Sequence, residues 1–504
     1  MLFCLAKVGF FYCNSRGRGI WQAAIGLKFL NIFKKPYICL VNQAMHKQQG
    51  QKKKLLLINP INAFTRDIPF LTESLSPPLG LGIVAALTPE DWDIALIDEN
   101  FDTFTYQEAD LVALSALTSA VRRAYEIAGI YRAKGIPVVL GGIHASMMPE
   151  EALKYVDAVV IGEAEGVWEN LLNDFETGSL RQTYSKNAGK IFHSPVPRRD
   201  LFHKGYGLAN IQTTRGCPFS CDFCSVHIFN GPMYRYRPIP EVLDEFEGID
   251  HNRVFIVDDN ILGTSKNSIE RARQLFKGII ERGIKKDWVC QASINFADDE
   301  SLLALASESG CRTVLLGIES EKAEGLIETN KRLNLKKGTE HYAEVFSKIH
   351  KHGISVIGAM IYGLDSDSEE DLYARSEFLV QSDIDTHQAN ILTPLPGTPL
   401  FERLKTEGRL TATNFPDDWD RYHCFDVVYK PKKMSSEKLK SVMIDNWDMI
   451  WNRKLMYRKF LKTLKQTGNK TAANWAFFGN IERYNLALGK MREPYKSDQI
   501  FFKG

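Results

Sequence analysis

The sequence predicts an α/β protein with two successive parallel sheets and a helical carboxyl-terminal region. Short apolar runs alternate with helical stretches from residue 54 to 176, and the same alternation resumes after about residue 201. Beyond Asn414 the pattern becomes Lys-rich, aromatic and helical. At 504 residues the chain exceeds what one hydrophobic core usually organises, so we expect several domains.

The composition is that of an ordinary soluble globular protein, with 44% hydrophobic and 25% charged residues. Basic and acidic residues number 63 and 61, so the overall charge gives no reason to expect a nucleic-acid partner. No stretch approaches 18 consecutive apolar residues, so we expect no membrane span. Nine cysteines are too sparse for a disulfide scaffold, which favours the reducing cytoplasm.

The first 66 residues contain no Asp or Glu, and basic residues interrupt their apolar stretches. We expect residues 1–53 to be an extension without a folded role, with translation beginning at Met45. An interfacial basic helix and a targeting leader are the alternatives, although these residues carry no signal-peptide cleavage pattern.

Residues 54–176 predict a doubly wound, Rossmann-like domain. Five short runs rich in apolar and β-branched residues alternate with helical stretches, as in a parallel sheet that helices cover on both faces. The runs are Leu55–Asn59, Ile94–Asp98, Leu111–Leu117, Val138–Gly141 and Ala158–Gly162. Ligands of this architecture bind at the carboxyl ends of the strands, so the residues that end each run are the candidates for binding.

These strand-end residues resemble the cobalamin-binding fold. Its pattern is Asp-x-His-x-x-Gly, then Ser-x-Leu, then Gly-Gly, and the matching residues are Asp98, Ser115, Leu117, Gly141 and Gly142. Glycines let the backbone approach a ligand closely, and a small hydroxyl can donate a hydrogen bond. The alternative is that they are turn residues of a generic doubly wound domain.

The match departs from the family where its histidine and glycine would stand, because this chain has Asn100 and Thr103 there. An amide cannot replace imidazole as an axial nitrogen donor, so the resemblance implies cobalamin without a protein histidine ligand. The runs Gly141–His144 and Gly162–Glu165 also resemble runs in cobalamin-dependent radical enzymes. We expect His144 to be a satisfied surface or loop histidine, and the polar residues 177–200 to form a linker.

Three cysteines lie at close spacing in the run Cys217-Pro218-Phe219-Ser220-Cys221-Asp222-Phe223-Cys224. An iron–sulfur cube takes four ligands, so three thiolates leave one iron open to another ligand. A structural zinc site is the alternative, with His227 as a fourth ligand. The remaining cysteines have no Cys or His partner at ligand spacing, and we expect them to be small buried hydrophobes. They are Cys4, Cys13, Cys39, Cys290, Cys311 and Cys424.

The pattern Cys-x-x-x-Cys-x-aromatic-Cys, with Phe223 in the aromatic position, resembles the radical S-adenosylmethionine (SAM) superfamily. The resemblance implies a [4Fe–4S] cluster on Cys217, Cys221 and Cys224. It also implies that SAM chelates the open iron and is cleaved, with one electron, to methionine and a 5′-deoxyadenosyl radical.

Residues 201–413 predict the partial, TIM-like (β/α)6 barrel of that superfamily. Six strands are expected in this part of the chain. One leads into Cys217, and the others are Val254–Val257, Trp288–Ala292, Thr313–Ile318, Ile354–Tyr362 and His387–Leu392. The run Leu395–Phe401 after the last strand also resembles the family and predicts a rigid turn.

Polar residues at the ends of these strands resemble the positions that contact SAM in the superfamily. They are Asp259 and Asn260, Gln291 and Ser293, and Glu319 in a Gly-Ile-Glu-Ser run. Carboxylate oxygens can accept hydrogen bonds from an amino group or from two ribose hydroxyls. Capping or turn residues are the alternative. Arg235 and Arg237 either orient a carboxylate or are solvated.

Residues 414–504 predict helices with many aromatic side chains, among them Trp419, Tyr422, Trp447 and Trp451. We expect these helices to pack against the open side of the barrel. A lid over a substrate pocket is the alternative, because carbon radicals must be kept from water.

The family resemblance covers residues 54–430 and implies a cobalamin-associated radical SAM enzyme that methylates an unreactive carbon. In related methylases one SAM supplies the methyl group through cobalamin and a second supplies the radical. A radical oxidoreductase or ring-forming cyclase of the same architecture is the second hypothesis, and a non-catalytic binding protein is the third. The expected partners are a small-molecule or natural-product substrate and an electron donor such as flavodoxin or ferredoxin. Lipids, tetrapyrroles and peptides all remain open as substrates.

Overall fold

The amino-terminal domain is built on a six-stranded parallel sheet in the order β2-β1-β3-β4-β5-β6. We describe a computed structural model that covers residues 52–66, 76–186, 189 and 191–489. The expectations about translation from Met45 and about Cys4, Cys13 and Cys39 lie outside these residues. The strands are β1 Lys53–Asn59, β2 Trp92–Asp98, β3 Leu111–Ser115, β4 Val138–Gly141, β5 Ala158–Ile161 and β6 Thr183–Ser185.

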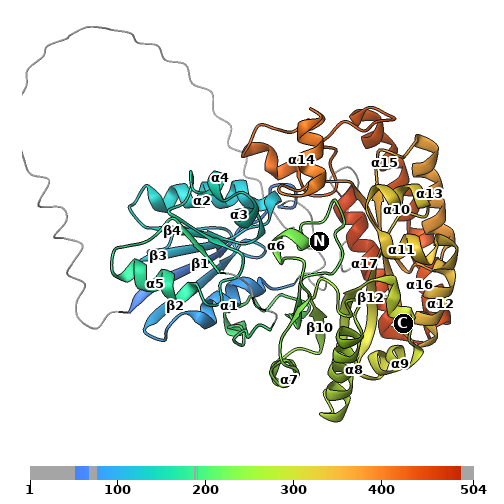
Figure 1. The fold of residues 1–504 in the computed structure, drawn as a ribbon, viewed down its shortest axis with the longest axis horizontal. Coiled ribbons are helices and arrows are strands. Elements are labelled where there is room, and N and C mark those ends of the chain that lie inside the picture. The colour runs from blue at the N-terminus through green and yellow to red at the C-terminus, as the bar shows by residue number, and fades with distance from the viewer. Residues whose placement is uncertain (1–51, 67–75, 187–188, 190, 490–504) are drawn as a thin grey trace, which may run out of the picture.

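Helices cover both faces of this sheet, as the alternating pattern predicts (Figure 1). On one face lie α2 Val121–Arg132, α3 Ile143–Met147 and α4 Pro149–Ala152. On the other lie α1 Leu79–Leu87 and α5 Trp168–Glu176. All five predicted strands are present. The sixth, β6, pairs in parallel with β5 and comes from residues 177–200, which we expected to be a linker.

The second domain is an open parallel sheet of six strands in the order β14-β13-β12-β11-β10-β7. These are β7 Ala209–Ile211, β10 Arg253–Ile256, β11 Asp287–Ala292, β12 Cys311–Glu319, β13 Ser355–Tyr362 and β14 Thr386–Ile391. Each neighbour in the sheet is the next strand of the barrel along the chain, which is the arrangement of a partial (β/α) barrel. The six strands predicted from the sequence are therefore confirmed.

Helices alternate with the barrel strands. They are α7 Ile239–Gly248, α8 Lys266–Glu281, α9 Glu300–Glu308, α10 Ala323–Glu328, α11 Arg332–Lys337, α12 Tyr342–Lys351 and α13 Glu369–Gln381. Two of them begin with capping boxes, Ser265 with Ser268 and Ser368 with Asp371, which satisfy backbone N–H groups at the helix start. A short ribbon of β8 Thr214–Arg215 and β9 Arg235–Tyr236 flanks the cysteine loop, and α6 Val226–Phe229 follows it.

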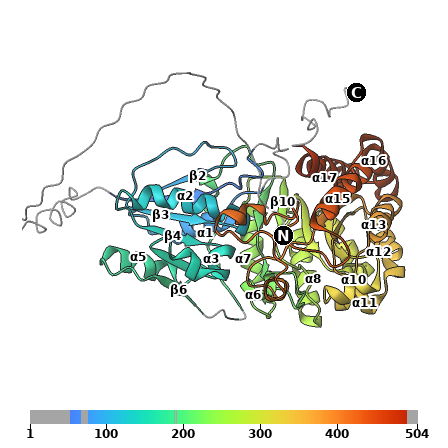
Figure 2. The ribbon, with the colours of Figure 1, turned by 90° about the horizontal axis from the view of Figure 1, so that it is seen from above.

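Three carboxyl-terminal helices, α15 Ser436–Ile450, α16 Arg453–Thr467 and α17 Lys470–Leu488, complete the barrel (Figure 2). Helix α17 contacts β12, β13 and β14. The Asn480 side chain binds the backbone N–H of His387 and the carbonyl of Asp385, and Trp447 Nε1 donates to the carbonyl of Ala389. These helices pack against the barrel as expected, and the Asn480 and Trp447 side chains bind backbone groups at and beside the free edge of β14.

The segment before α15 does not behave as expected. Helix α14 Pro399–Thr406 begins after the rigid turn, whose Gly397 has a φ of 78°. Trp419 and Tyr422 then pack into the core of the first domain, beside α2, and not against the barrel. Apolar composition alone predicts burial, but it does not say which core receives a side chain. Among the described residues, no helix is both long enough and apolar enough to cross a bilayer.

Candidate active site

The three predicted cluster cysteines come together in the loop between β8 and α6. Cys221 is buried, and Cys217 and Cys224 are half-buried. Burial is the main cause that raises the pKa of Cys217 to about 11 and that of Cys221 to about 12, and another cysteine of the loop contributes to each of these shifts. Such thiols need a cationic partner to ionise. Three thiols on one short loop are the donor set that a [4Fe–4S] cluster with one open iron requires.

Glycine is required at the entrance to this loop. Gly216 has a φ of 86°, and a Cβ atom there would overlap the carbonyl oxygen of Met233. Its backbone N–H donates to Asp259 Oδ2 at 3.1 Å. Within the part of the chain that the structure describes, no group of three His, Cys, Asp or Glu side chains is arranged around a single metal ion.

Glu319 lies at the end of β12, beside the cysteine loop, in a left-handed conformation with a φ of 63°. Its Oε1 is 2.7 Å from Lys331 Nζ, and both side chains are largely buried. Burial opposes the charge on Lys331, but Glu319 and Cys221 raise the pKa of Lys331 above its ordinary value. Gly317 leaves room for this pair, because a Cβ atom there would be 2.5 Å from Lys331 Nζ.

Lys331 is the main residue of the barrel site that sequence reasoning missed. It belongs to no motif and no apolar period, and it reaches Glu319 only because the chain turns back after α10. Asn330, which precedes it, has a φ of 55° and donates to the carbonyl of Ser220 in the cysteine loop at 2.8 Å. Lys331 is therefore held against the loop by its own neighbour.

The predicted SAM contacts at the ends of β10 and β11 gather at one place, and each already has a hydrogen-bond partner within the protein. Asp259 accepts from Asn230 Nδ2 at 2.8 Å as well as from Gly216. Asn260 donates to Ser293 Oγ at 2.9 Å, and Gln291 Nε2 donates to the carbonyl of Asp258 at 3.2 Å. Half-buried Asp259 and Gln291 remain accessible to a ligand, whereas Asn260 and Ser293 are buried.

Phe223, in the loop, and Asp258, beside it, are both held by the protein. Phe223 packs against the barrel core and is half-buried. Asp258 is buried and accepts from the backbone N–H and the hydroxyl of Thr213, both at 2.6 Å, so it ties β7 to β10 and is not free to bind a ligand.

The predicted cobalamin residues lie at the carboxyl edge of the first sheet. Gly142 has a φ of 90°, and a Cβ atom there would lie 2.9 Å from the backbone nitrogen and oxygen of Ala116. Ser115 Oγ has no hydrogen-bond partner among the described residues, and Leu117 is 38% exposed. This edge fits the close approach of a nucleotide tail. The two glycines expose the backbone, the Ser115 hydroxyl is available as a donor, and the Leu117 side chain offers an apolar contact.

Asp98 and Asn100 are joined to the barrel side of the molecule. Asp98 is buried, and accepts from Asn59 Nδ2 at 2.8 Å and from the Tyr206 hydroxyl. Asn100 Nδ2 donates to the same hydroxyl at 3.0 Å. The residue that stands in place of the family's histidine is thus engaged within the protein, as its amide chemistry suggests.

His144 is not a surface or loop histidine, contrary to our expectation. It lies in α3 and is 0% exposed, with its ring nitrogens 3.3 Å from Thr118 Oγ1 and from Glu151 Oε1. Glu151 also accepts from Trp419 Nε1 at 2.9 Å. His144 lies two residues after Gly142, so its hydrogen bonds to Thr118 and Glu151 stabilise the Gly-Gly turn from the buried side.

The two candidate sites face each other across the domain seam. Helix α3 begins directly after Gly142, and α6 begins two residues after Cys224, and the two helices are in contact. The Figure 1 ribbon shows α3 and α6 side by side. The cobalamin edge of the first sheet therefore adjoins the cysteine loop of the barrel.

An ion-pair cluster joins the domains beside this contact. Arg215, two residues before Cys217, lies 2.8 Å from Glu163 and 2.7 Å from Glu165. Arg235 also pairs with Glu163, and both guanidinium groups lie over the ring of Phe192. Glu163 and Glu165 belong to the Gly162–Glu165 run, whose contact with the barrel the sequence did not predict.

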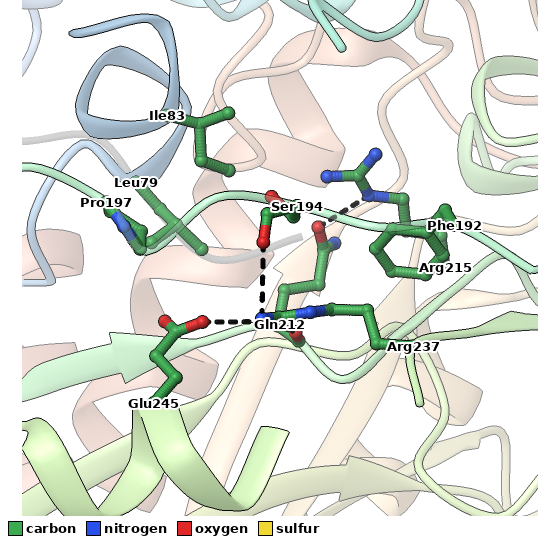
Figure 3. Close-up of a pocket in the computed structure, with 9 residues that line it drawn as sticks. All are labelled: Leu79, Ile83, Phe192, Ser194, Pro197, Gln212, Arg215, Arg237 and Glu245. Atoms are coloured by element: carbon green, nitrogen blue, oxygen red, sulfur yellow. Dashed lines mark hydrogen bonds and ion pairs between the residues drawn. The ribbon is translucent and has the colours of Figure 1, made fainter. Parts of the chain in front are cut away.

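Arg235 and Arg237 are not solvated, because both are buried and paired with protein carboxylates. Arg237 binds Glu245 at 2.7 Å beside a small pocket between α1 and the barrel (Figure 3). The pocket has a volume of about 10 Å³, which is room for about one water molecule. It marks the domain seam and is too small for a cofactor. Of the other cysteines, Cys290 and Cys311 are buried as expected, whereas Cys424 is half-buried.

Comparison with known proteins agrees with this geometry. Residues 211–379 match the model of the radical SAM superfamily, and residues 72–172 match that of the B12 binding domain. Two bacteriochlorophyllide d methyltransferases of Chlorobaculum tepidum are similar to the chain. The C-12(1) enzyme is 33% identical over 78% of this chain and 86% of its own length, and the C-8(2) enzyme is 30% identical over 75% and 87%.

Solved structures show the same fold at lower identity. The radical SAM methyltransferase TsrM from Kitasatospora setae, with cobalamin and a [4Fe–4S] cluster bound, superposes with a TM-score of 0.63. The superposition covers 86% of this chain and 99% of TsrM, and the two sequences are 18% identical. The cobalamin-dependent radical enzyme OxsB also gives 0.63, over 89% of this chain and 74% of OxsB, at 15% identity.

The fold and the site define a radical SAM enzyme with an amino-terminal B12-binding domain, and the chain belongs to that family. Its cofactors are a [4Fe–4S] cluster, SAM and cobalamin, and its reaction is methyl transfer to carbon. The cyclase alternative is not favoured. The anaerobic magnesium-protoporphyrin IX monomethyl ester cyclase of Rubrivivax gelatinosus is only 25% identical, over 73% of its length.

Proposed function

We propose that this enzyme methylates an unreactive carbon of a tetrapyrrole of the bacteriochlorophyllide class. The observation that carries the proposal is the 33% identity, over 86% of its length, to a methyltransferase named for such a substrate. The hopanoid C-2 methylase of Rhodopseudomonas palustris is less similar, at 28% identity over 73% of its length.

In this proposal Cys217, Cys221 and Cys224 hold the cluster, and Gly141 and Gly142 with Ser115 and Leu117 hold cobalamin. When bound, the cluster supplies the electron that cleaves SAM, and cobalamin supplies the carrier of the methyl group. Asp98 supports the edge through Tyr206. Asn100 gives cobalt no nitrogen ligand.

The barrel residues bind and orient SAM. Phe223, Asp259, Gln291 and Glu319 are the proposed contacts, and the buried pair Asn260 and Ser293 holds the strand ends that carry them. Lys331 joins them, because a buried ammonium beside the cysteine loop can pair with a carboxylate. Glu319 already holds this ammonium in place, so the cation is positioned before any ligand arrives. Its charge also stabilises the thiolate forms of the loop cysteines.

The electron donor is proposed to be a small redox protein such as flavodoxin or ferredoxin, and the compartment to be the cytoplasm. The six cysteines among the described residues are all free, which suits a reducing compartment.

A substrate comparison tests this proposal. The anaerobically reconstituted full chain would receive SAM with a trideuterated methyl group and, in separate reactions, bacteriochlorophyllide d, a hopanoid, or magnesium-protoporphyrin IX monomethyl ester. Mass spectrometry should find the labelled methyl on carbon of the bacteriochlorophyllide. Methylation of the hopanoid alone would refute the tetrapyrrole assignment, and oxidation of the magnesium porphyrin without label would restore the cyclase hypothesis.

A further inference from the structure

Arg483, on α17, is a buried cation for which the described residues provide no ion pair or hydrogen bond. It is 8% exposed, and its Nε is buried and makes no hydrogen bond. The other buried arginines differ. Arg215, Arg235, Arg237 and Arg375 pair with carboxylates, and Arg271 donates to backbone carbonyls.

The position of Arg483 places it at the carboxyl end of the barrel. One turn earlier on α17, Asn480 binds the backbone at the start of β14. The charge of Arg483 acts on the thiol of Cys424, whose carbonyl accepts from the N–H of Ile391 at the end of β14 at 2.9 Å. Helix α17 therefore runs along β14, and Arg483 lies near the strand end, where barrel enzymes bind their substrates.

An aromatic surface adjoins this cation. Leu486, one turn beyond Arg483, packs with Phe64 and Phe425. Phe64 stacks on the ring of His423 at 3.8 Å. Phe64 follows β1 of the first domain, whose carboxyl edge carries the proposed cobalamin residues. The cation and the aromatic surface thus meet where the ligand-binding ends of the two sheets converge.

We propose that Arg483 binds the carboxylate of an apolar macrocyclic substrate, whose body lies on the surface of Phe64, Phe425 and Leu486. This inference rests on the proposed function and deepens it, because it names the group by which the substrate is held. Burying an unpaired guanidinium is costly, and an incoming carboxylate removes that cost by bidentate pairing. A chlorophyllide, which carries a free propionate, has the required anion, and its ester does not.

A pair of matched probes tests the inference on the full chain with its cofactors. Pheophorbide a and its propionate methyl ester share one macrocycle and differ in that single charge. Binding would be followed by chlorin fluorescence. The wild type should bind the acid at least tenfold more tightly than the ester. Arg483→Met, which keeps the length of the side chain, should bind both equally. Arg273→Met, on α8 and outside the proposed site, should keep the wild-type preference.

A wild type that shows no preference for the acid, including one that binds neither probe, overturns the inference, as does an Arg483→Met variant that keeps the preference. Should Arg483→Met fail to fold, Arg483→Lys serves, and it should prefer the acid more weakly than the wild type. Deoxyadenosine formation by the wild type is measured separately. Absence of deoxyadenosine would refute the proposed function. The binding preference for the acid over the ester would still show whether Arg483 binds a carboxylate.

Discussion

Buried thiols and a buried ammonium lie together at the cysteine loop, and each favours the charged form of the other. Burial alone holds Cys217 and Cys221 in the thiol form, because a thiolate loses its hydration there. Lys331 opposes this effect, and iron opposes it more strongly, since a coordinating thiol is deprotonated outright. Loss of one thiol should therefore change the charge balance of the remaining thiols and of Lys331.

Cys221→Ala should abolish cluster assembly and reductive cleavage of SAM, because two thiols cannot retain the cluster. Iron and sulfide counts and deoxyadenosine release measure both effects. Cys311→Ala is the matched control, because Cys311 is buried at the start of β12, at the opposite end of the strand from Glu319. It should cost about 1 kcal/mol of stability and keep the cluster. Cleavage retained in Cys221→Ala would refute the ligand assignment.

The buried His144 predicts a pH dependence of stability. Burial lowers the pKa of His144, so the ring is neutral in the folded protein. In the unfolded chain its pKa returns to about 6.5, so the unfolded state takes up a proton as the pH falls through that value. Stability should then fall on acidification by at most about 1.4 kcal/mol per pH unit, and the effect should be absent above about pH 7.5.

Urea unfolding at pH 5.5 and 7.5 measures this dependence in the wild type and in His144→Gln. The variant should lose part of the difference between the two pH values. The exposed His193→Gln is the control and should behave as the wild type does. An unchanged pH dependence in His144→Gln would show that His144 is not the group responsible.

At the scale of elements, the turn between β4 and α3 carries the cobalamin assignment. Gly142→Ala combines a positive φ with a close contact to Ala116, so the turn must shift. Cobalt retention after reconstitution should fall by more than tenfold. Gly135→Ala, in the same domain, has a positive φ but no atom within 4 Å of the added Cβ, and it should retain cobalt. Equal cobalt contents in the two variants would mean that the turn does not approach the cofactor.

The elements themselves were largely predictable, because alternation of apolar runs is a local signal. All eleven predicted strands are present, and the strand ends that carry Asp98, Ser115 and Glu319 were located from the sequence. Strand β6 was missed because its single buried residue, Tyr184, leaves no apolar run to recognise. The roles of Lys331 and Arg483 and the position of Trp419 in the first domain's core were not predicted for another reason. Each depends on which distant segments meet in the fold, and no local period encodes that.

At the scale of the whole molecule, the ion pairs of Glu163 and Glu165 with Arg215 and Arg235 connect the first domain to the strand that enters the cysteine loop. Burial opposes ionisation of Glu163, but Arg235 and Arg215 lower its pKa below the ordinary value. These ion pairs therefore fix the distance between the two proposed cofactor sites.

Glu163→Gln should loosen this connection without removing any cofactor ligand. Radical formation and methyl transfer would then be less well coupled, so the ratio of deoxyadenosine to methylated product should rise several-fold while iron and cobalt contents stay unchanged. Asp244→Asn breaks the exposed pair with Arg282 and should leave the ratio as in the wild type. An unchanged ratio in Glu163→Gln would assign the pair a purely structural role.

The products formed from SAM distinguish methyl transfer through cobalamin from other radical reactions. The reconstituted full chain, supplied with reductant, SAM and bacteriochlorophyllide d under anaerobic conditions, should release one S-adenosylhomocysteine and one deoxyadenosine for each methyl group transferred. Deoxyadenosine without S-adenosylhomocysteine and without methylated product would contradict methyl transfer through cobalamin. The absence of both would contradict the assignment of a radical SAM enzyme.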